Sequence, residues 1–257
     1  MTRRVLRDSQ TLTAEYEKLL PGDVVVGRLR LRPGEEHILL DLTARGVTLI
    51  PPALSQLCSR SKVFQARLLG SYMLPGTAAV YNRHDLQELI IEYGRREVGR
   101  VVCKLDRGNG GQGVLLFASV EEVYSASMLG SLSFPYVLQP FVENCRDLRA
   151  VFLGTVEDAY ERFNPHGFRH NLHCGAESRP AKLSEGQRAL CRKVMERAGF
   201  PYAHIDLLVD GTGATWLGEI NLRGGLRGSR LNQKDYLEAV ESMHERMLAE
   251  LVNTPGK

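Results

Sequence analysis

The sequence has few cysteines, no long apolar run and little excess charge, and each absence excludes a class of protein. Its five cysteines are odd in number and form no CxxC pair, so neither a disulfide framework nor a zinc site is indicated. No apolar run approaches the roughly 18 residues of a membrane span, and the first residues lead into polar sequence rather than a signal segment. We expect a cytoplasmic protein with reduced thiols and no membrane partner.

The balance of charges and the length limit the partners and the architecture. The chain has 33 Lys and Arg against 30 Asp and Glu, a net charge of +3, which is too small to imply nucleic-acid binding. We expect no nucleic-acid partner, and any basic site must be local. A length of 257 residues allows one large core or two to three smaller lobes.

The segment from His204 to Gly228 carries the clearest chemistry. Apolar residues alternate with others before the turn Asp210–Gly213, which predicts a hairpin of two strands. Asp206 lies in its first strand, and Glu219 and Asn221, two positions apart in the second, project from one face. Two carboxylates and an amide carbonyl are ligands of a hard cation such as Mg²⁺. Taken alone, the pattern is also typical of carboxylates that merely face solvent.

A second hairpin is predicted around a glycine-rich loop. A strand ending in Lys104 precedes the loop, and a strand at 114–117 follows it; the loop glycines are Gly108, Gly110, Gly111 and Gly113. This order differs from the strand, loop, helix order of a Walker loop or a Rossmann fingerprint. Glycines let backbone N–H groups approach a phosphate, and Lys104 adds a cation. The pattern favours a phosphate-binding flap over a turn that binds nothing.

Capping residues and apolar periodicity mark several helices. Ser61 can cap a helix, and Ser119–Glu122 and Ser184–Gln187 have the spacing of capping boxes. Apolar residues at helical spacing predict a last helix over 233–252. Its apolar stripe would be core or a subunit contact, and we expect a homo-oligomer.

Three arginines precede the predicted hairpin that contains Asp206 and Glu219, and lie on predicted strands or the loop between them: Arg149, Arg162 and Arg169. Arginine suits bidentate contact with phosphate or carboxylate, although a solvated strand residue is the ordinary alternative. Together with Arg223, they suit an acceptor that carries an extra anionic group.

These motifs, in this order, resemble the ATP-grasp superfamily, in particular the RimK-type amino-acid ligases and glutathione synthetases. The resemblance covers roughly residues 55–252; single motifs are weak, whereas eight in register are specific. They are Ser59-Arg60-Ser61-Lys62, Lys104 with its glycine loop, Leu138-Gln139-Pro140-Phe141-Val142, Asp147-Leu148-Arg149, Glu161-Arg162, Phe168-Arg169-His170-Asn171-Leu172-His173, Asp206, and Glu219-Ile220-Asn221 with Gly225-Leu226.

The resemblance implies an α/β (α+β) fold, the ATP-grasp fold, in which two α+β subdomains clasp ATP. The first subdomain, at 59–138, would carry the glycine-rich flap, and the second, at 139–257, the Mg²⁺ site. Residues 1–58 contain three short apolar runs separated by Pro–Gly and Pro–Pro pairs, which predict a short α/β lobe in front of them. This lobe is shorter than the domain that usually precedes the ATP-grasp domain.

The resemblance also implies roles for the matched residues. Nucleotide contacts would come from Lys62, Lys104, the loop glycines, the adenine hinge Gln139, Pro140, Phe141 and Val142, and the nearby Asp147. Arg169 and Asn171 would lie near the phosphates or the acceptor carboxylate, and Arg162 at the reacting centre. Mg²⁺, or Mn²⁺ in its place, would be bound by Asp206, Glu219 and Asn221.

Three positions depart from the family pattern. Pro140 has no N–H, so only its carbonyl can accept a hydrogen bond from adenine, and Leu105 stands where proline is common. Arg223-Gly224 replaces the usual small residue and proline. Arg223 is therefore either a further anion contact at the reacting centre or a solvated loop residue.

The implied activity is an ATP-dependent carboxylate–amine ligase acting on small-molecule or peptide substrates. A substrate carboxylate would take the γ-phosphoryl group, and an amine would displace phosphate from the acylphosphate to give an amide or peptide bond. Two alternatives stay open: a nucleotide-binding module without turnover, acting as a sensor or assembly protein, and a kinase that stops at a phosphorylated product. We expect variants that lack Asp206 or Glu219 to lose turnover and remain folded.

Overall fold

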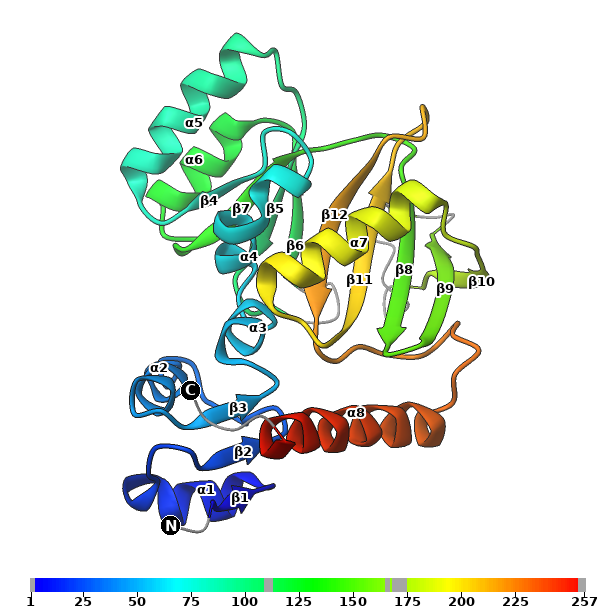
Figure 1. The fold of residues 1–257 in the computed structure, drawn as a ribbon. Coiled ribbons are helices and arrows are strands. Elements are labelled where there is room, and N and C mark those ends of the chain that lie inside the picture. Colours follow the sequence, from blue (N-terminus) through cyan, green and yellow to red (C-terminus); the bar gives the residue numbers. More distant parts are fainter. Residues whose placement is uncertain (1–2, 109–112, 165–166, 168–174, 254–257) are drawn as a thin grey trace.

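The computed structural model describes residues 3–108, 113–164, 167 and 175–253, and arranges them around three β-sheets (Figure 1). The α-helices are α1 (Ser9–Glu15), α2 (His37–Ala44), α3 (Ala53–Cys58), α4 (Lys62–Leu69), α5 (Arg83–Arg95), α6 (Val120–Met128), α7 (Glu185–Ala198) and α8 (Gln233–Asn253). The strands are β1 (Val5–Leu6), β2 (Val24–Val26), β3 (Thr48–Ile50), β4 (Ala78–Val80), β5 (Val101–Leu105), β6 (Val114–Phe117), β7 (Tyr136–Pro140), β8 (Arg146–Leu153), β9 (Val156–Phe163), β10 (Glu177–Pro180), β11 (Tyr202–Val209) and β12 (Thr215–Asn221).

The N-terminal lobe is a small parallel sheet with helices, as its apolar runs predict. Its strands lie in the order β1–β2–β3, and Leu39 and Leu42 of α2 are fully buried in its core. The last helix, α8, runs below the five-stranded sheet to this lobe (Figure 1). Residues near its end, Met247 and Leu251, pack against the lobe. The N- and C-terminal parts of the chain therefore share one core.

The apolar stripe of α8 packs against other parts of the same chain for most of its length. Tyr236 and Met243 belong to the core of the five-stranded sheet, whereas Leu237 is 52% exposed. Of the two interpretations of the stripe, core is the one observed. The stripe therefore gives no support for a homo-oligomer, which stays a prediction.

The central sheet contains the glycine-rich hairpin. Its antiparallel strands lie in the order β4–β7–β5–β6, and helices α5 and α6 bury Leu86, Tyr93 and Val123 against it. β5 and β6 pair directly, as predicted. Lys104 stands near the end of β5 at the mouth of the loop.

The C-terminal sheet has an apolar face and a polar face. Its antiparallel strands lie in the order β10–β9–β8–β11–β12. Helix α7 crosses one face (Figure 1) and buries Cys191, Val194 and Ala198 in the core there. The strand period places charged side chains on the other face.

Local sequence explains where α7 begins and ends, and it explains α6 less completely. At α7, Ser184 and Gln187 form the predicted reciprocal capping box, and Gly199 ends the helix at φ 67°. At α6, Ser119 caps Glu122 N–H, but the Glu122 carboxylate accepts from Ala118 N–H instead of Ser119 N–H. The prediction of a reciprocal box at Ser119 was therefore wrong, because one residue earlier in the chain offers its N–H to Glu122.

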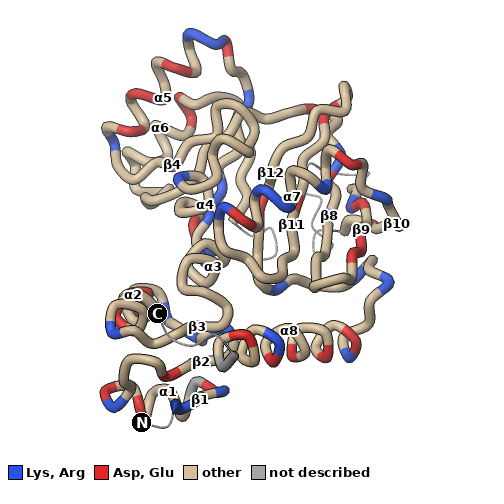
Figure 2. The backbone as a smooth tube through the Cα atoms, in the orientation of Figure 1, with Lys and Arg blue, Asp and Glu red and all other residues tan. Residues whose placement is uncertain are grey.

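Basic and acidic residues both occur along the helices α5, α7 and α8 (Figure 2). Within the described ranges, no helix combines the length and the apolar character that crossing a membrane requires.

A buried glutamine joins α4 to the C-terminal sheet. Gln65 is 2% exposed. Its amide nitrogen donates to the carbonyls of Cys58 and Ile220 (2.8 and 2.9 Å), and its oxygen accepts from Ile220 N–H at 3.0 Å. Since Ile220 lies between Glu219 and Asn221, these bonds fix the start of α4 beside the predicted metal ligands.

We expect Gln65→Leu to lower the free energy of unfolding by roughly 3 kcal/mol, because three buried backbone groups lose their partners. Chemical denaturation measures the change. Gln10→Leu, the same substitution on an exposed turn of α1, is the control and should change stability little. Equal effects of the two substitutions would contradict a linking role for Gln65.

Candidate functional site

Strand register brings the predicted metal ligands together on the polar face of the C-terminal sheet. Asp206 of β11 is paired with Glu219 of β12 on one side and with Arg149 of β8 on the other. Side chains of directly paired residues lie on the same face, and Asn221 shares it because it follows Glu219 by two positions. The register shifts after Asp206, opposite Gly218. A Cβ at Gly218 would come within 3.1 Å of the Asp206 carbonyl oxygen, so the close approach favours glycine.

Asp206, Glu219 and Asn221 together form what we call the carboxylate row. Two lysines reach this row from outside the sheet. Lys62 Nζ lies 3.4 Å from a carboxylate oxygen of Glu219 and donates to the carbonyl of Gly108 in the glycine hairpin. Lys104 Nζ donates to the carbonyl of Gly218 at 3.5 Å. Burial lowers the pKa of Lys104, while the carboxylates of Glu219 and Asp206 oppose that change. The two lysines therefore lie close to the carboxylates of Glu219 and Asp206, between the central sheet and the C-terminal sheet.

The start of α4 is fixed to the glycine hairpin through Asp106, which our sequence analysis did not single out. Its carboxylate accepts from the Ser61 hydroxyl at 2.9 Å and from Val63 N–H at 3.2 Å. Ser61 is also the N-cap of α4, as predicted, and accepts from Phe64 N–H. Since Lys62 follows Ser61, these bonds place it beside the hairpin.

Arg149 and Arg162 are engaged by carboxylates of the sheet. Arg149 donates twice to Asp206, at 2.6 and 2.8 Å. The side chain of Arg162, 5% exposed, lies 2.9 Å from Asp206 and 2.6 Å from Asp147. Their charges are therefore balanced within the protein, and the expectation that both face an anionic acceptor is revised.

The two buried carboxyl groups have opposite pKa shifts. Burial by itself would raise the pKa of Asp206, but Arg149 and Arg162 outweigh it and hold that pKa well below its usual range. Burial raises the pKa of Asp147, the charge of Asp206 adds to the rise, and Arg162 opposes it. Asp206 is therefore ionised, as a metal ligand requires.

Removing Asp206 would leave two arginines without their partner, which for a buried ion pair typically costs about 3–5 kcal/mol. We therefore revise the expectation that an Asp206 variant remains folded. Glu219 is the better position for testing the chemistry.

The predicted adenine hinge lies where the chain leaves the central sheet. Gln139 and Pro140 end β7 and pair with Val102 and Val101 of β5. Phe141 N–H donates to the carbonyl of Arg100 at 2.9 Å, and the Arg100 guanidinium stacks 4.6 Å from the Phe141 ring centre. Val142 follows in the connection to β8.

The remaining predicted residues are only partly described. Gly108 and Gly113 lie at the base of the loop, where Leu105 N–H donates to the Gly113 carbonyl at 2.7 Å. Four predicted positions lie outside the described residues: Gly110, Gly111, Arg169 and Asn171.

Arg223 has a different setting from Arg149 and Arg162. It lines a pocket beside the N-terminal lobe together with Arg28, Arg30 and Arg60. Arg60 belongs to the matched segment Ser59-Arg60-Ser61-Lys62, whereas our sequence analysis singled out neither Arg28 nor Arg30.

A buried histidine beside the carboxylate row is held neutral. His204 is 2% exposed, and neither ring nitrogen has a hydrogen-bond partner among the described residues. Burial, reinforced by the charge of Arg149, lowers the pKa of His204 to about 4, although Asp206 opposes the change. The ordinary value of this group is 6.5.

We expect this histidine to make the metal-free protein sensitive to acid. Between pH 6.5 and 4 the unfolded chain binds the proton more readily, so the free energy of unfolding falls as the pH falls; at pH 4.5 the loss from His204 is about 2.5 kcal/mol. Urea denaturation of wild type and His204→Phe at pH 7 and pH 4.5 measures it. An equal fall in both proteins would contradict the assignment, since other groups titrate in both.

Comparison with known proteins gives concordant results. The family model described as the RimK-like ATP-grasp domain matches residues 60–239. A probable alpha-L-glutamate ligase of Cellvibrio japonicus is 32% identical over 177 residues, covering 66% of this chain and 58% of the relative. A glutathione synthetase of Agrobacterium fabrum is 28% identical over 138 residues, covering 50% of this chain and 42% of the relative. The chain thus spans about three fifths or less of these relatives.

Solved structures share the fold at low sequence identity. D-alanine–D-alanine ligase from Bacillus anthracis, complexed with ATP, matches with a TM-score of 0.65 at 14% identity, covering 95% of this chain and 85% of that one. A D-cycloserine synthetase matches with a TM-score of 0.64 at 19% identity, covering 87% and 84%. The predicted α+β ATP-grasp fold is confirmed. Because the family model matches well over half of the sequence, this chain belongs to the RimK-like ATP-grasp family.

Proposed function

We propose that the chain is an ATP-dependent ligase that joins a carboxylate to an amine through an acylphosphate. One observation carries the proposal: Lys62 and Lys104 reach, from outside the C-terminal sheet, the carboxylate row that contains Glu219. The names of the relatives, glutamate ligase and glutathione synthetase, support the same class. The substrates, and a homo-oligomer in the cytoplasm, are parts of this proposal.

The donor set of the site fits Mg²⁺, with Mn²⁺ as a substitute. Asp206, Glu219 and Asn221 offer oxygen atoms on one face, and Asp206 is ionised. Within the described ranges, no group of three or more His, Cys, Asp or Glu side chains could hold a metal. The proposed set contains only two such residues, Asp206 and Glu219, and the Asn221 amide is its third member. Two carboxylates and an amide would leave coordination positions for substrate phosphates, which Mg²⁺ commonly shares. A bound Mg²⁺ would supply charge neutralisation at the phosphates.

The protein's own groups position the substrates and balance their charge. Lys62 and Lys104 would neutralise phosphate oxygens, Gly108 and Gly113 would let the flap approach them, and the hinge at 139–142 would hold adenine near Asp147. Arg162 and Arg149 keep Asp206 ionised and oriented. Arg169 and Asn171 would complete the phosphate or acceptor contacts, as the family resemblance implies.

The chemistry needs no protein nucleophile. A carboxylate oxygen of the substrate attacks the γ-phosphorus and ADP leaves; the amine nitrogen then attacks the acyl carbon, phosphate leaves, and the amine gives up its proton to solvent. Such steps depend mostly on positioning and electrostatics. The cysteines fit this account, because burial raises the pKa of Cys58, Cys103 and Cys191 to about 12 and keeps them as thiols.

The first test is phosphate release from MgATP across pools of amino acids and small peptides, followed by mass spectrometry of the products. An amide product that requires both a carboxylate and an amine supports a ligase. A phosphorylated product that no amine consumes indicates a kinase. Binding of MgATP without turnover in any pool indicates the nucleotide-binding module.

We expect Glu219→Gln to lower the rate of phosphate release roughly a hundredfold or more, because a metal-binding charge is lost while the shape is kept. Glu177→Gln, on the exposed edge strand β10 of the same sheet, is the control and should retain the rate. Near wild-type turnover of Glu219→Gln, with an unchanged thermal midpoint, would remove Glu219 from the site.

We expect Lys104→Met to weaken MgATP binding about 10- to 100-fold, because a charge-assisted hydrogen bond to phosphate is lost. Calorimetric titration with a non-hydrolysable analogue measures the dissociation constant. Lys193→Met, exposed on α7, should bind as wild type does. An affinity that does not change in Lys104→Met would rule out a phosphate contact.

A further inference from the structure

The three proposed metal ligands differ in how their side chains are held. Asp206 is paired with two arginines, and a carboxylate oxygen of Glu219 lies 3.4 Å from Lys62 Nζ. Among the described residues, the side chain of Asn221 has no hydrogen-bond partner. An amide carries no charge and offers a single oxygen atom, so its value as a ligand depends strongly on its orientation. That orientation must come from the backbone of Asn221.

The backbone at Asn221 lies on the outermost strand of the C-terminal sheet. β12 ends the strand order, and Asn221 pairs with His204 of β11. The residues on either side of it, Ile220 and Leu222, are buried. Buried backbone groups on the outer edge of such a strand need partners from other parts of the chain. Side chains supply these partners on both sides of Asn221.

Two side chains from different segments hold Leu222. Its N–H donates to Ser59 Oγ at 3.0 Å, and its carbonyl accepts from the Tyr236 hydroxyl at 3.2 Å. Ile220 is held in the same way, because Gln65 bonds to both its N–H and its carbonyl. The peptide groups before and after the proposed metal ligand are therefore both fixed.

The backbone that carries the Ser59 hydroxyl is itself anchored. Ser59 directly follows α3, and its N–H donates to the carbonyl of Ser55 at 2.9 Å. The preceding carbonyl, that of Cys58, accepts from the Gln65 amide at 2.8 Å. A hydroxyl presented by such a fixed backbone can hold Leu222 in one position.

Tyr236 is equally well supported. It is 4% exposed, and its ring centre lies 5.3 Å from that of His204, the strand partner of Asn221. Burial raises the pKa of Tyr236 to about 12, although Arg223 and Arg28 oppose the change. The hydroxyl therefore keeps its proton and donates to the Leu222 carbonyl.

We propose that Ser59 and Tyr236 are positioning residues of the metal site, which act through Leu222 to orient the amide oxygen of Asn221 toward the metal ion. The proposal rests on the proposed ligase function, in which Asn221 binds Mg²⁺. It gives α8 a role in the site, because Tyr236 lies on the first turn of that helix. Groups that orient metal ligands in this way commonly affect metal affinity strongly.

Titration with Mn²⁺ tests the proposal without turnover, because electron paramagnetic resonance distinguishes the free ion from the bound one. The dissociation constant is measured for the protein alone and with a non-hydrolysable ATP analogue. We expect Tyr236→Phe, which removes only the hydroxyl group, and Ser59→Ala each to weaken Mn²⁺ binding about 10-fold. Wild-type affinity in either variant overturns the role of that residue.

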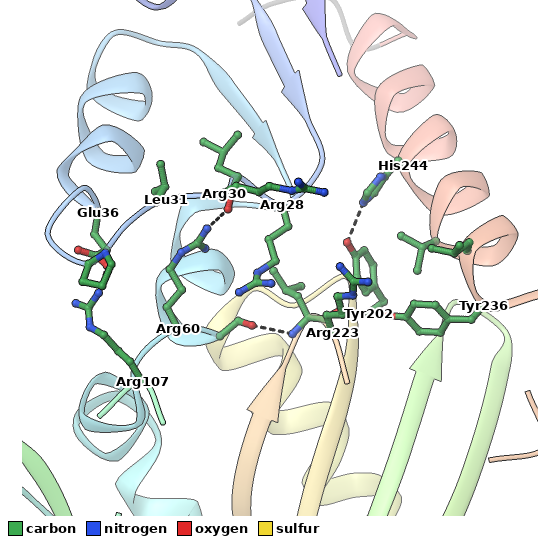
Figure 3. A pocket seen from close by; sticks show the side chains of 16 residues that line it. Arg28, Arg30, Leu31, Glu36, Arg60, Arg107, Tyr202, Arg223, Tyr236 and His244 are labelled. Carbon is green, nitrogen blue, oxygen red and sulfur yellow. Dashed lines mark hydrogen bonds and ion pairs between the residues drawn. The ribbon is translucent and has the colours of Figure 1, made fainter. Parts of the chain in front are cut away.

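Two matched substitutions separate positioning from stability. Tyr202→Phe removes a hydrogen bond of 2.9 Å to His244 of α8 (Figure 3), so it loosens the same helix and leaves the bonds of Leu222 intact. Ser119→Ala removes a hydroxyl that accepts from a backbone N–H of α6. Both should lower the thermal midpoint and keep the wild-type affinity for Mn²⁺. An equal loss of affinity in Tyr202→Phe and Tyr236→Phe overturns the proposal, because the effect would then follow the attachment of α8.

A double-mutant cycle shows whether the hydroxyl acts through the proposed ligand. Asn221→Ala should itself weaken Mn²⁺ binding, and Tyr236→Phe added to it should cause no further loss, since the group that the hydroxyl orients is gone. A further loss in the double variant equal to that in Tyr236→Phe alone overturns the proposal. Thermal midpoints show whether each variant is folded.

Failure of this proposal can be told apart from failure of the ligase function. Glu219→Gln marks the metal site in the same titration. If Mn²⁺ binding depends on Glu219 but on neither Ser59 nor Tyr236, the metal site stands and the positioning role is refuted. If Glu219→Gln binds Mn²⁺ as tightly as wild type does, the metal assignment within the ligase proposal is refuted, and the positioning role with it.

Discussion

The ion pairing of Asp206 with Arg149 and Arg162 is the constraint on which the C-terminal sheet depends. Charged groups this deeply placed are costly unless they are paired, and the register of β8 and β11 brings Arg149 and Asp206 into contact at 2.6 Å. The same pairing keeps Asp206 ionised. The carboxylate that stabilises the sheet is therefore also the one that we propose as a metal ligand, so a substitution there would alter structure and chemistry together.

Two further anchors place the remaining groups against this sheet. Gln65 joins α4 to β12 at Ile220, and Asp106 joins α4 to the base of the glycine hairpin. Lys62, at the start of α4, contacts both Glu219 and the hairpin as a result. Reactions that depend on positioning need this kind of support, since small displacements of charged groups reduce the rate strongly.

The arginines of this protein differ in function because their partners differ. Arg149 and Arg162 form ion pairs with carboxylates and link strands of the C-terminal sheet. Arg28 and Arg223 have the same guanidinium group but face a cavity without a carboxylate partner among the described residues. The N-terminal lobe, although short, supplies part of that cavity, and α8 closes it on the opposite side (Figure 3). The partners of each arginine, which the fold decides, therefore determine whether its charge is balanced by a carboxylate.

Local sequence determined much of this protein, including the hairpin with Asp206, Glu219 and Asn221, the strand order around the glycine loop, and the capping box at Ser184. Each follows from residues a few positions apart, through strand or helix periodicity and through hydrogen bonds within one turn. Only the tertiary structure decided which arginines are neutralised and that Arg28 and Arg223 share a pocket, because such pairs lie far apart in the sequence. Periodicity fixes the face on which a side chain lies, whereas register between distant strands and the packing of lobes fix its partner.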